Sequence, residues 1–256
     1  MDAIKKEYGR KRRTAIENAE EAVYEEKKME EMEVCFLMDR FGYMKLIDKN
    51  AYERNKEAVH NENKYVFNCM NTDKICIFTD TGKMHTIKAV DIPLGRFRDK
   101  GTPVDNLSNY DSSQERMLYV APVGQLRSDR LLFVTKTSMC KLVEGAEFDV
   151  AKRTIASTKL ADEDELIFIG SASEMEQIVL QSHGGCFLRF LTQEVSTMKK
   201  TALGVRGMKL ADDDYLEHAY LLAGHQEYTI SYHDKEYALN KVRLAKRDTK
   251  GIKPRI

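Results

Sequence analysis

Residues 74–87, KICIFTDTGKMHTI, contain an apolar run, a short Thr-Gly turn and a second run. The runs are too short for helices, are rich in β-branched and aromatic residues, and are joined by turn residues, so the stretch predicts a β-hairpin. Aligning Gly42, Gly82, Ser138, Gly185 and Lys235 brings four similar stretches into register with it: 34–47, 130–143, 177–190 and 227–240. A repeat of this size predicts a radial or solenoid array, because one hairpin cannot bury its own apolar faces.

A basic segment and then an acidic turn follow the complete hairpins. KLADED at 159–164 recurs almost letter for letter as KLADDD at 209–214, each time before a predicted strand. The basic segments, here called arms, contain Arg96, Arg98 and Lys100; Lys152 and Arg153; Lys199, Lys200, Arg206 and Lys209; and Lys246, Arg247 and Lys250. Lysine and arginine neutralise phosphates, so the arms are candidate contacts to a nucleic-acid backbone. The alternative is that they are solvated loops.

The composition limits the remaining classes. The 256 residues carry 41 basic and 41 acidic side chains, so the overall charge predicts no polyanion partner, yet the charges are segregated into arms and turns. The five cysteines lack metal-type spacing, which favours buried thiols. Without a signal peptide or an apolar stretch of about 18 residues, we expect a cytoplasmic protein.

Catalytic and cofactor motifs are missing from the sequence. The acid pairs Asp162/Asp164 and Asp212/Asp214 could hold a divalent ion, but their recurrence at each module junction favours a structural role. Neither a P-loop nor a dinucleotide fingerprint is present. We therefore expect no cofactor and no metal in this chain. Residues 1–31 are highly charged and predict a helical or flexible linker, and residues 32–256 form the predicted repeat domain.

Several segments resemble one known family. IKKEYG at 4–9 with RRT at 12–14 is similar to the linker that precedes the C-terminal domain of the DNA gyrase A subunit, while IFTDTGK at 77–83, KGTPVDNL at 100–107 and GVRGMKL at 204–210 resemble hairpins and arms of the gyrase and topoisomerase IV A subunits. The resemblance implies an all-β fold, a β-pinwheel of four-stranded blades. Five hairpins imply five blades, or six if one is too divergent to detect.

The resemblance also implies function and partners. Duplex DNA would bind the basic rim, and the partners would be the rest of the A subunit, as a homodimer, and the ATPase B subunit. The catalytic tyrosine and magnesium site would belong to a breakage-reunion domain outside this sequence, and ATP to the B subunit, so this chain alone would not be an enzyme. We expect the isolated domain to be a monomer that does not bind membranes.

The first blade departs from the gyrase pattern. Gyrases carry a Q-R-R-G-G-x-G box there, and the equivalent segment, 52–58 (YERNKEA), lacks the glycines and contains acids. In the family the box is tied to chiral wrapping, so its loss favours a topoisomerase IV-like protein over a gyrase with a degenerate box. Arg54 and Lys56 remain candidate phosphate contacts in this first arm. A propeller-like scaffold for protein partners is the alternative to DNA binding.

Overall fold

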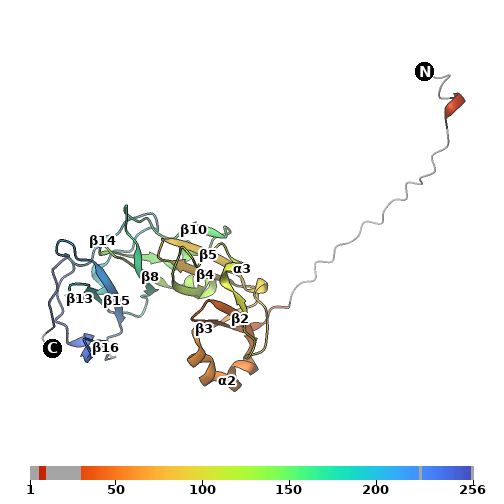
Figure 1. Ribbon diagram of the computed structural model, residues 1–256. Helices are drawn as coiled ribbons and strands as arrows, with labels where there is room; N and C mark the ends of the chain where they lie inside the picture. The colour runs from red at the N-terminus through yellow and green to blue at the C-terminus, as the bar shows by residue number, and fades with distance from the viewer. Residues whose placement is uncertain (1–5, 10–29, 225–226, 255–256) are drawn as a thin grey trace. The chain divides into compact units, whose positions relative to one another are not determined.

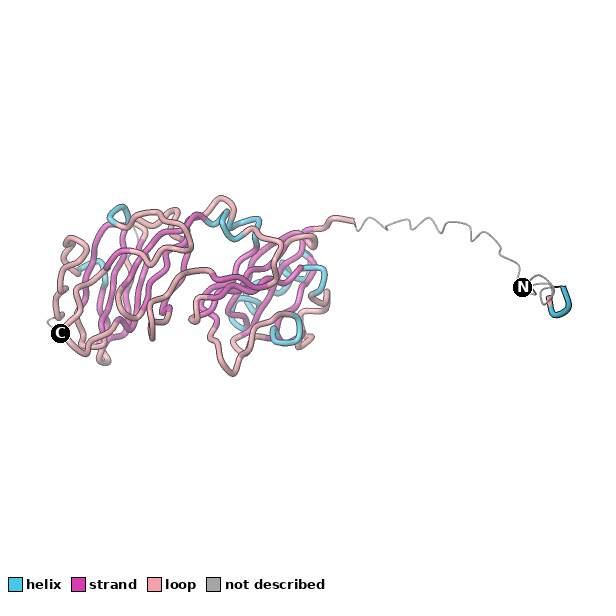
Figure 2. Tube along the Cα trace, turned by 90° about the horizontal axis from the view of Figure 1, so that it is seen from above, coloured by secondary structure: helices cyan, strands magenta, loops and turns pink. Residues whose placement is uncertain are grey.

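The computed structural model describes residues 6–9, 30–224 and 227–254 (Figure 1). Contacts divide the chain into residues 1–30 and residues 31–256. The interpretation of 1–31 as a linker concerns mainly residues 1–5 and 10–29, which lie outside the described part of the chain. In residues 31–256, strands are the main regular structure, and helices and loops connect them (Figure 2).

The strands form five sheets, which we call blades 1 to 5 in chain order. Blades 1 to 3 are four-stranded, with the orders β3-β1-β2-β6, β10-β5-β4-β7 and β11-β8-β9-β14, blade 4 has the order β13-β12-β15, and blade 5 has β16-β17. The strands are β1 (Glu33–Asp39), β2 (Tyr43–Asp48), β3 (Asn63–Met70), β4 (Lys74–Thr79), β5 (Lys83–Lys88), β6 (Thr102–Pro103), β7 (Met117–Pro122), β8 (Arg130–Thr135), β9 (Met139–Glu144), β10 (Thr154–Ala156), β11 (Leu166–Ser171), β12 (Gln177–Ser182), β13 (Phe187–Leu191), β14 (Val205–Arg206), β15 (Leu216–Leu222), β16 (Thr229–Tyr232) and β17 (Lys235–Ala238).

The helices are short apart from one. They are α2 (Lys49–Glu62), η1 (Ala89–Asp91), α3 (Val104–Leu107), α4 (Val123–Leu126), η2 (Gly145–Phe148), η3 (Thr192–Glu194) and η4 (Leu239–Lys241).

All five predicted hairpins are confirmed. They are β1-β2, β4-β5, β8-β9, β12-β13 and β16-β17, each antiparallel. Four of the aligned positions have positive φ, including the non-glycine Ser138 at 74°. In the fifth turn the positive φ angles fall on His233 and Asp234, just before the aligned Lys235, as a two-residue hairpin turn requires.

The core lies between neighbouring blades. Because side chains alternate along a strand, β4 points Ile75 and Ile77 toward blade 1, in a cluster with Phe36, and points Phe78 toward blade 3, in a cluster with Phe133. Both faces of β4 are therefore buried, as are those of β8 and β12. This explains why the strands appear in the sequence as continuous apolar runs rather than as alternating ones.

Candidate nucleic-acid interface

Each arm crosses from its own hairpin to the preceding blade. The arm after β5 covers 93–103 and ends in β6, which pairs with β2 of blade 1, and the arm 149–156 supplies β10 to β5 of blade 2. The arm 196–206 supplies β14 to β9 of blade 3. In the arm 243–252, Ile252 exchanges two 2.8 Å backbone hydrogen bonds with Phe187 of blade 4. Strands are thus exchanged between neighbours, as the resemblance implied.

This topology puts the arms at the outer edges of the sheets. The opposite edges are formed by β3, β7, β11 and β15, and β7 contacts β3 on one side and β11 on the other, while β11 also contacts β15. Successive blades therefore meet along these inner strands. The basic residues of the arms lie at the other end of the strand order.

Two strand lysines hold arms in place. Lys45 Nζ donates to the carbonyls of Phe97 and Asp99 at 2.5 Å each. Lys141, which occupies the same hairpin position in blade 3, donates to the carbonyls of Lys200 and Ala202 at 2.7 Å each. Lys141 is only 1% exposed, and this burial lowers its pKa to about 8. The sequence analysis did not find these lysines, although their recurrence at one position of two hairpins was a detectable signal.

Many of the predicted arm cations are exposed. In the described part of the chain, no ion pair involves these exposed side chains: Arg96, Arg98, Lys100, Lys152, Arg153, Lys209, Lys246 and Lys250. Lys100 Nζ lies 4.3 Å from the centre of the Tyr43 ring, a cation–π distance. These side chains are therefore available to an external anion.

The other predicted cations make contacts that hold the arms in place. Arg206 forms a two-pronged ion pair with Asp248, with Nε and Nη2 distances of 2.5 and 3.0 Å. Arg247 Nε donates to the Glu194 carbonyl at 3.1 Å, and Lys200 Nζ donates to the Glu147 carbonyl at 2.9 Å. Lys199 is also paired with the Glu147 carboxylate, at 3.5 Å, but its side chain is 81% exposed.

The prediction of an arm at 52–58 is wrong, because these residues lie in helix α2. The Asp48 carboxylate caps the helix by accepting from Ala51 N at 2.8 Å, and the helix bends at Asn55, whose φ of −123° is not helical. Each arm crosses to the blade that precedes its own hairpin. Blade 1 has no preceding blade in the described residues, and its second strand, β2, is followed by helix α2 within the same blade. In Figure 1, α2 lies beside β2 and β3. Arg54 and Lys56 are exposed on this helix.

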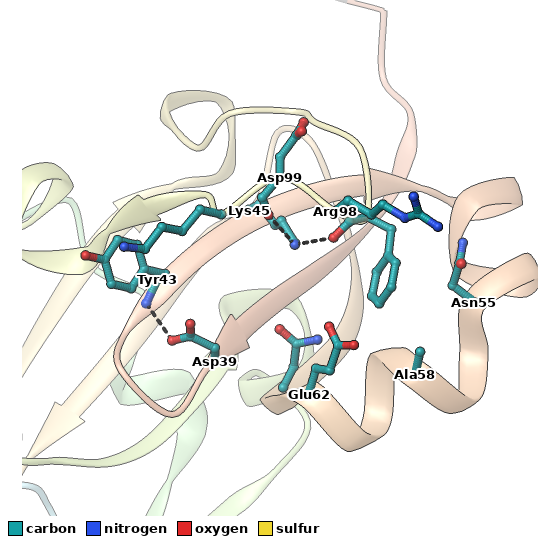
Figure 3. Close-up of a pocket in the computed structure, with 11 residues that line it drawn as sticks. Asp39, Tyr43, Lys45, Asn55, Ala58, Glu62, Arg98 and Asp99 are labelled. Atoms are coloured by element: carbon teal, nitrogen blue, oxygen red, sulfur yellow. Dashed lines mark hydrogen bonds between the residues drawn. The ribbon is translucent and has the colours of Figure 1, made fainter.

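A polar pocket of about 690 Å³ lies between α2 and the arm 93–103 (Figure 3). Figure 3 shows the Arg98 side chain extending toward Asn55 of the helix, whereas the Asp99 carboxylate points away from the helix. Lys45 lies in the pocket, where burial lowers its pKa although Asp99 and Glu62 oppose that shift. Acids and bases are mixed here, so this pocket does not present the single sign of charge that an anion-binding cleft needs.

The acidic turns stabilise the hairpin turns. Asp164 accepts from Thr137 N at 3.1 Å and from Thr137 Oγ1 at 2.6 Å, and Asp214 accepts from Gly184 N at 2.9 Å. Burial opposes ionisation of Asp214, but hydrogen bonds from Gly184, Ser182 and the Tyr215 backbone outweigh it and lower its pKa. The recurring acids therefore have a defined structural contact. Within the described residues, His, Cys, Asp and Glu side chains form no group of three or more that could hold a metal.

Four of the cysteines, Cys35, Cys69, Cys76 and Cys140, are buried thiols, and Cys186 is half-buried. Burial raises the pKa of Cys35 to about 11 and those of the other three buried thiols to about 12. The described helices include none that is long and apolar enough to cross a membrane.

The exchanged strands, the blades and the basic outer edges define the class: a β-pinwheel domain with a candidate nucleic-acid interface. Comparison with known proteins agrees. The family described as "DNA gyrase C-terminal domain, beta-propeller" matches residues 73–112, 129–173 and 176–223. The chain belongs to this family.

Curated relatives are gyrase A subunits. The DNA gyrase A subunit of Clostridium acetobutylicum is 29% identical over 218 residues, covering 81% of this chain and 26% of the relative, and that of Salmonella typhimurium is 28% identical over 226 residues, covering 84% and 26%. The chain thus spans about a quarter of the length of these relatives.

Solved structures show the same fold. The C-terminal domain of DNA topoisomerase IV matches with a TM-score of 0.75 at 22% identity, covering 87% of this chain and 72% of that one. The C-terminal domain of E. coli ParC matches with a TM-score of 0.68 at 15% identity, covering 87% of this chain and 94% of that one. A DNA gyrase A C-terminal domain matches with a TM-score of 0.57 at 18% identity, covering 86% of this chain and 76% of that one.

Proposed function

We propose that this domain binds duplex DNA by its backbone along the outer edges of the blades. The observation that carries the proposal is the strand order, in which three arms supply the outermost strand of a sheet and the fourth bridges to the edge strand of blade 4. The arms so present exposed cations such as Arg96, Lys152 and Lys246 at the perimeter. Contacts to phosphates are electrostatic and independent of sequence. A duplex held at several points along a curved edge would be bent, at a cost of a few kcal/mol that the phosphate contacts offset.

Charge placement supports DNA over a protein partner. Asp99 and Asp248 are engaged within the arms, since Asp99 accepts from Arg96 N at 2.7 Å and Asp248 pairs with Arg206. The third arm acid, Asp149, pairs with Arg127 at 2.7 Å. The acidic turns are joined to the hairpin turns through Asp164 and Asp214. Basic residues outnumber acidic ones in every arm, so the outer edges are net positive, whereas a scaffold for mixed protein partners would show both signs along the edge.

In the complete protein, we infer that this domain serves the A subunit of a bacterial, cytoplasmic type IIA topoisomerase. It would hold DNA while the remainder of the A subunit dimer cleaves and reseals with Mg²⁺ and while the B subunit hydrolyses ATP. The domain itself would be non-catalytic. The family resemblance and the curated gyrase A relatives support this assignment.

Replacement of the gyrase box by α2 favours a topoisomerase IV-like role. A capped helix that packs Val59 into the blade cannot offer the glycine-rich backbone that the box provides. We expect binding to nicked circles, followed by religation, to change the linking number little. A clear positive shift would instead assign the domain to the gyrase side.

Salt dependence tests DNA binding directly. We expect the chain to bind a linear duplex of about 40 base pairs, which is well below the DNA persistence length of about 150 base pairs. In the double variant Arg96→Ala/Arg98→Ala, the slope of log K against log salt should fall by about 1.8, since each phosphate contact contributes about 0.9.

The matched control is Lys88→Ala/Lys235→Ala, which also removes two exposed cations but leaves the arms intact. It should keep the wild-type slope. Salt-independent or absent binding by the wild-type chain would refute the proposed function. If the two double variants lowered the salt slope equally, the assignment of the interface to the arms would be refuted.

A further inference from the structure

The tip of the first hairpin carries an exposed aromatic ring. Phe41 is 86% exposed, more than any other large apolar side chain of the described residues. The same turn position holds Thr81, Thr137 and Gly184 in blades 2, 3 and 4. Burying a phenylalanine ring is worth about 2 kcal/mol, so a soluble protein gains nothing from leaving one in water at a turn that accepts polar residues.

The turn holds Phe41 rigidly. The Asp39 carboxylate accepts from Phe41 N at 2.8 Å and from Tyr43 N at 3.0 Å, and Gly42 has a φ of 81°. A side chain at Gly42 would lie 3.3 Å from Met117 and Val104, so the turn packs closely against blade 2. The backbone that carries the ring is therefore held in one place, and little backbone entropy would be lost on binding.

The surroundings of this tip are basic, unlike those of the later tips. In blades 3 and 4 an acidic turn sits against the hairpin turn through Asp164 and Asp214. In blade 1 the chain enters β3 from α2 through Asn63, which pairs with Asp39, and then Lys64, which is exposed. Arg40, next to Phe41, is also exposed.

Acids near the first tip are directed elsewhere. Glu62 lines the pocket that contains Lys45, and the Asp39 carboxylate is used within the turn. Asp80 lies 3.5 Å from Arg116, the residue before Met117. Asp105, next to Val104, accepts from Ser112 N at 2.8 Å. The tip thus presents a ring beside Arg40 and close to Lys64, and the Asp39 carboxylate at its base is hydrogen-bonded to the turn backbone.

The tip lies next to the arm 93–103. Lys100 of that arm covers the ring of Tyr43, two residues from Phe41, at 4.3 Å. A duplex held by Arg96, Arg98 and Lys100 would therefore pass close to the tip. Exposed apolar side chains flanked by cations are the means by which DNA-bending proteins enter a base step and kink it.

We propose that Phe41 enters a base step of the bound duplex as an apolar wedge, with Arg40 and Lys100 on the flanking phosphates. The inference rests on the proposed DNA-binding function. A protein partner would need an apolar patch around the ring, whereas the turn around Phe41 offers Arg40, Gly42 and a Tyr43 covered by lysine. Flexible pyrimidine–purine steps would be preferred, since they unstack most easily.

Two optical readouts test the wedge on a duplex of about 40 base pairs. End-to-end energy transfer reports the bend, and 2-aminopurine placed at TA steps reports unstacking. The variants are Phe41→Ala, Phe41→Leu, which keeps an apolar side chain, and the control Val90→Ala, which removes an exposed apolar side chain away from any hairpin tip.

We expect Phe41→Ala to lose the 2-aminopurine signal, to bend DNA less and to bind about fivefold more weakly at an unchanged salt slope. Phe41→Leu should retain part of the bend, and Val90→Ala should match the wild type. If the wild type binds with the arm-dependent slope but Phe41→Ala leaves bend and unstacking unchanged, the wedge is overturned and the proposed function stands. If the wild type does not bind duplex, both fail.

Discussion

Replacing Asp214 by alanine tests the structural role of the acidic turns. Its Oδ1 accepts from Gly184 N and from Tyr215 N, both at 2.9 Å, and joins the turn before β15 to the tip of the fourth hairpin. Hydrogen bonds to a charged group contribute about 1.5 to 3 kcal/mol each when buried. Because Asp214 is half-buried, we take the lower end and expect Asp214→Ala to lower the free energy of unfolding by about 2 to 3 kcal/mol in total.

Two further variants make the result specific. Asp214→Asn keeps an oxygen that can accept both bonds and should cost only about 1 kcal/mol. Asp212→Ala makes the same chemical change in the same turn. Asp212 is exposed and accepts no hydrogen bond within the described residues, so we expect a change below about 0.5 kcal/mol.

The assay is urea unfolding followed by circular dichroism and tyrosine fluorescence, with the free energy extrapolated to zero denaturant. Comparable losses in Asp212→Ala and Asp214→Ala would refute the proposed role of the carboxylate, as would equal losses in the Asn and Ala variants. The pH dependence gives an independent check. The folded pKa of Asp214 is lowered, so its contribution is present above the unfolded pKa and is lost as pH falls through the folded pKa. The difference in the free energy of unfolding between wild type and Asp214→Asn should therefore shrink as the pH falls below about 4.

Two other predictions concern how the arms are held. Gly101→Ala should lower the free energy of unfolding by about 2 kcal/mol or more, because the φ of Gly101 is 82° and the new Cβ would lie 2.5 Å from the Met44 carbonyl oxygen. The control is Gly124→Ala in α4, where the new Cβ would make only ordinary van der Waals contacts. This variant should be neutral or stabilising in the same thermal melt. Burial lowers the pKa of Lys141 to about 8 while the unfolded side chain titrates near 10.5, so the unfolded state binds more protons between these values and stability should rise with pH there. Wild type should gain stability relative to Lys141→Met between pH 7 and 9.5, with exposed Lys209→Met as control, and a pH-independent difference would contradict the assignment.

Local patterns made the hairpins predictable. Apolar runs of three or four residues followed by a short polar or glycine-containing turn specify a hairpin through local preferences alone, and all five hairpins lie at their expected places. The strands after KLADED and KLADDD also appear as expected, as β11 and β15. The assignment of 52–58 to an arm failed because it relied on position in the repeat, while capping by Asp48 and the Ala, Glu and Lys content favour a helix there.

The candidate site was only partly predictable. A lysine or arginine looks the same in sequence whether it is exposed like Arg96 or paired like Arg206 with Asp248, 42 residues away. The roles of Lys45 and Lys141 could not be predicted, because a single lysine in a strand does not show which carbonyls a distant arm brings to it. Only their recurrence at one hairpin position was a signal in the sequence. The exposure of Phe41 cannot be deduced from the sequence, because it depends on which elements pack over a turn.

The sequence by itself determined the repeat, the hairpins, the order of arms and acidic turns, and the family, because each depends on residues close together in the chain. The tertiary structure decided that every arm crosses to the preceding blade, that Asp164 and Asp214 stabilise hairpin turns, and which cations remain for DNA. The physical reason is that strand partners and burial are set by contacts between residues about 30 to 60 positions apart, which local propensity does not encode.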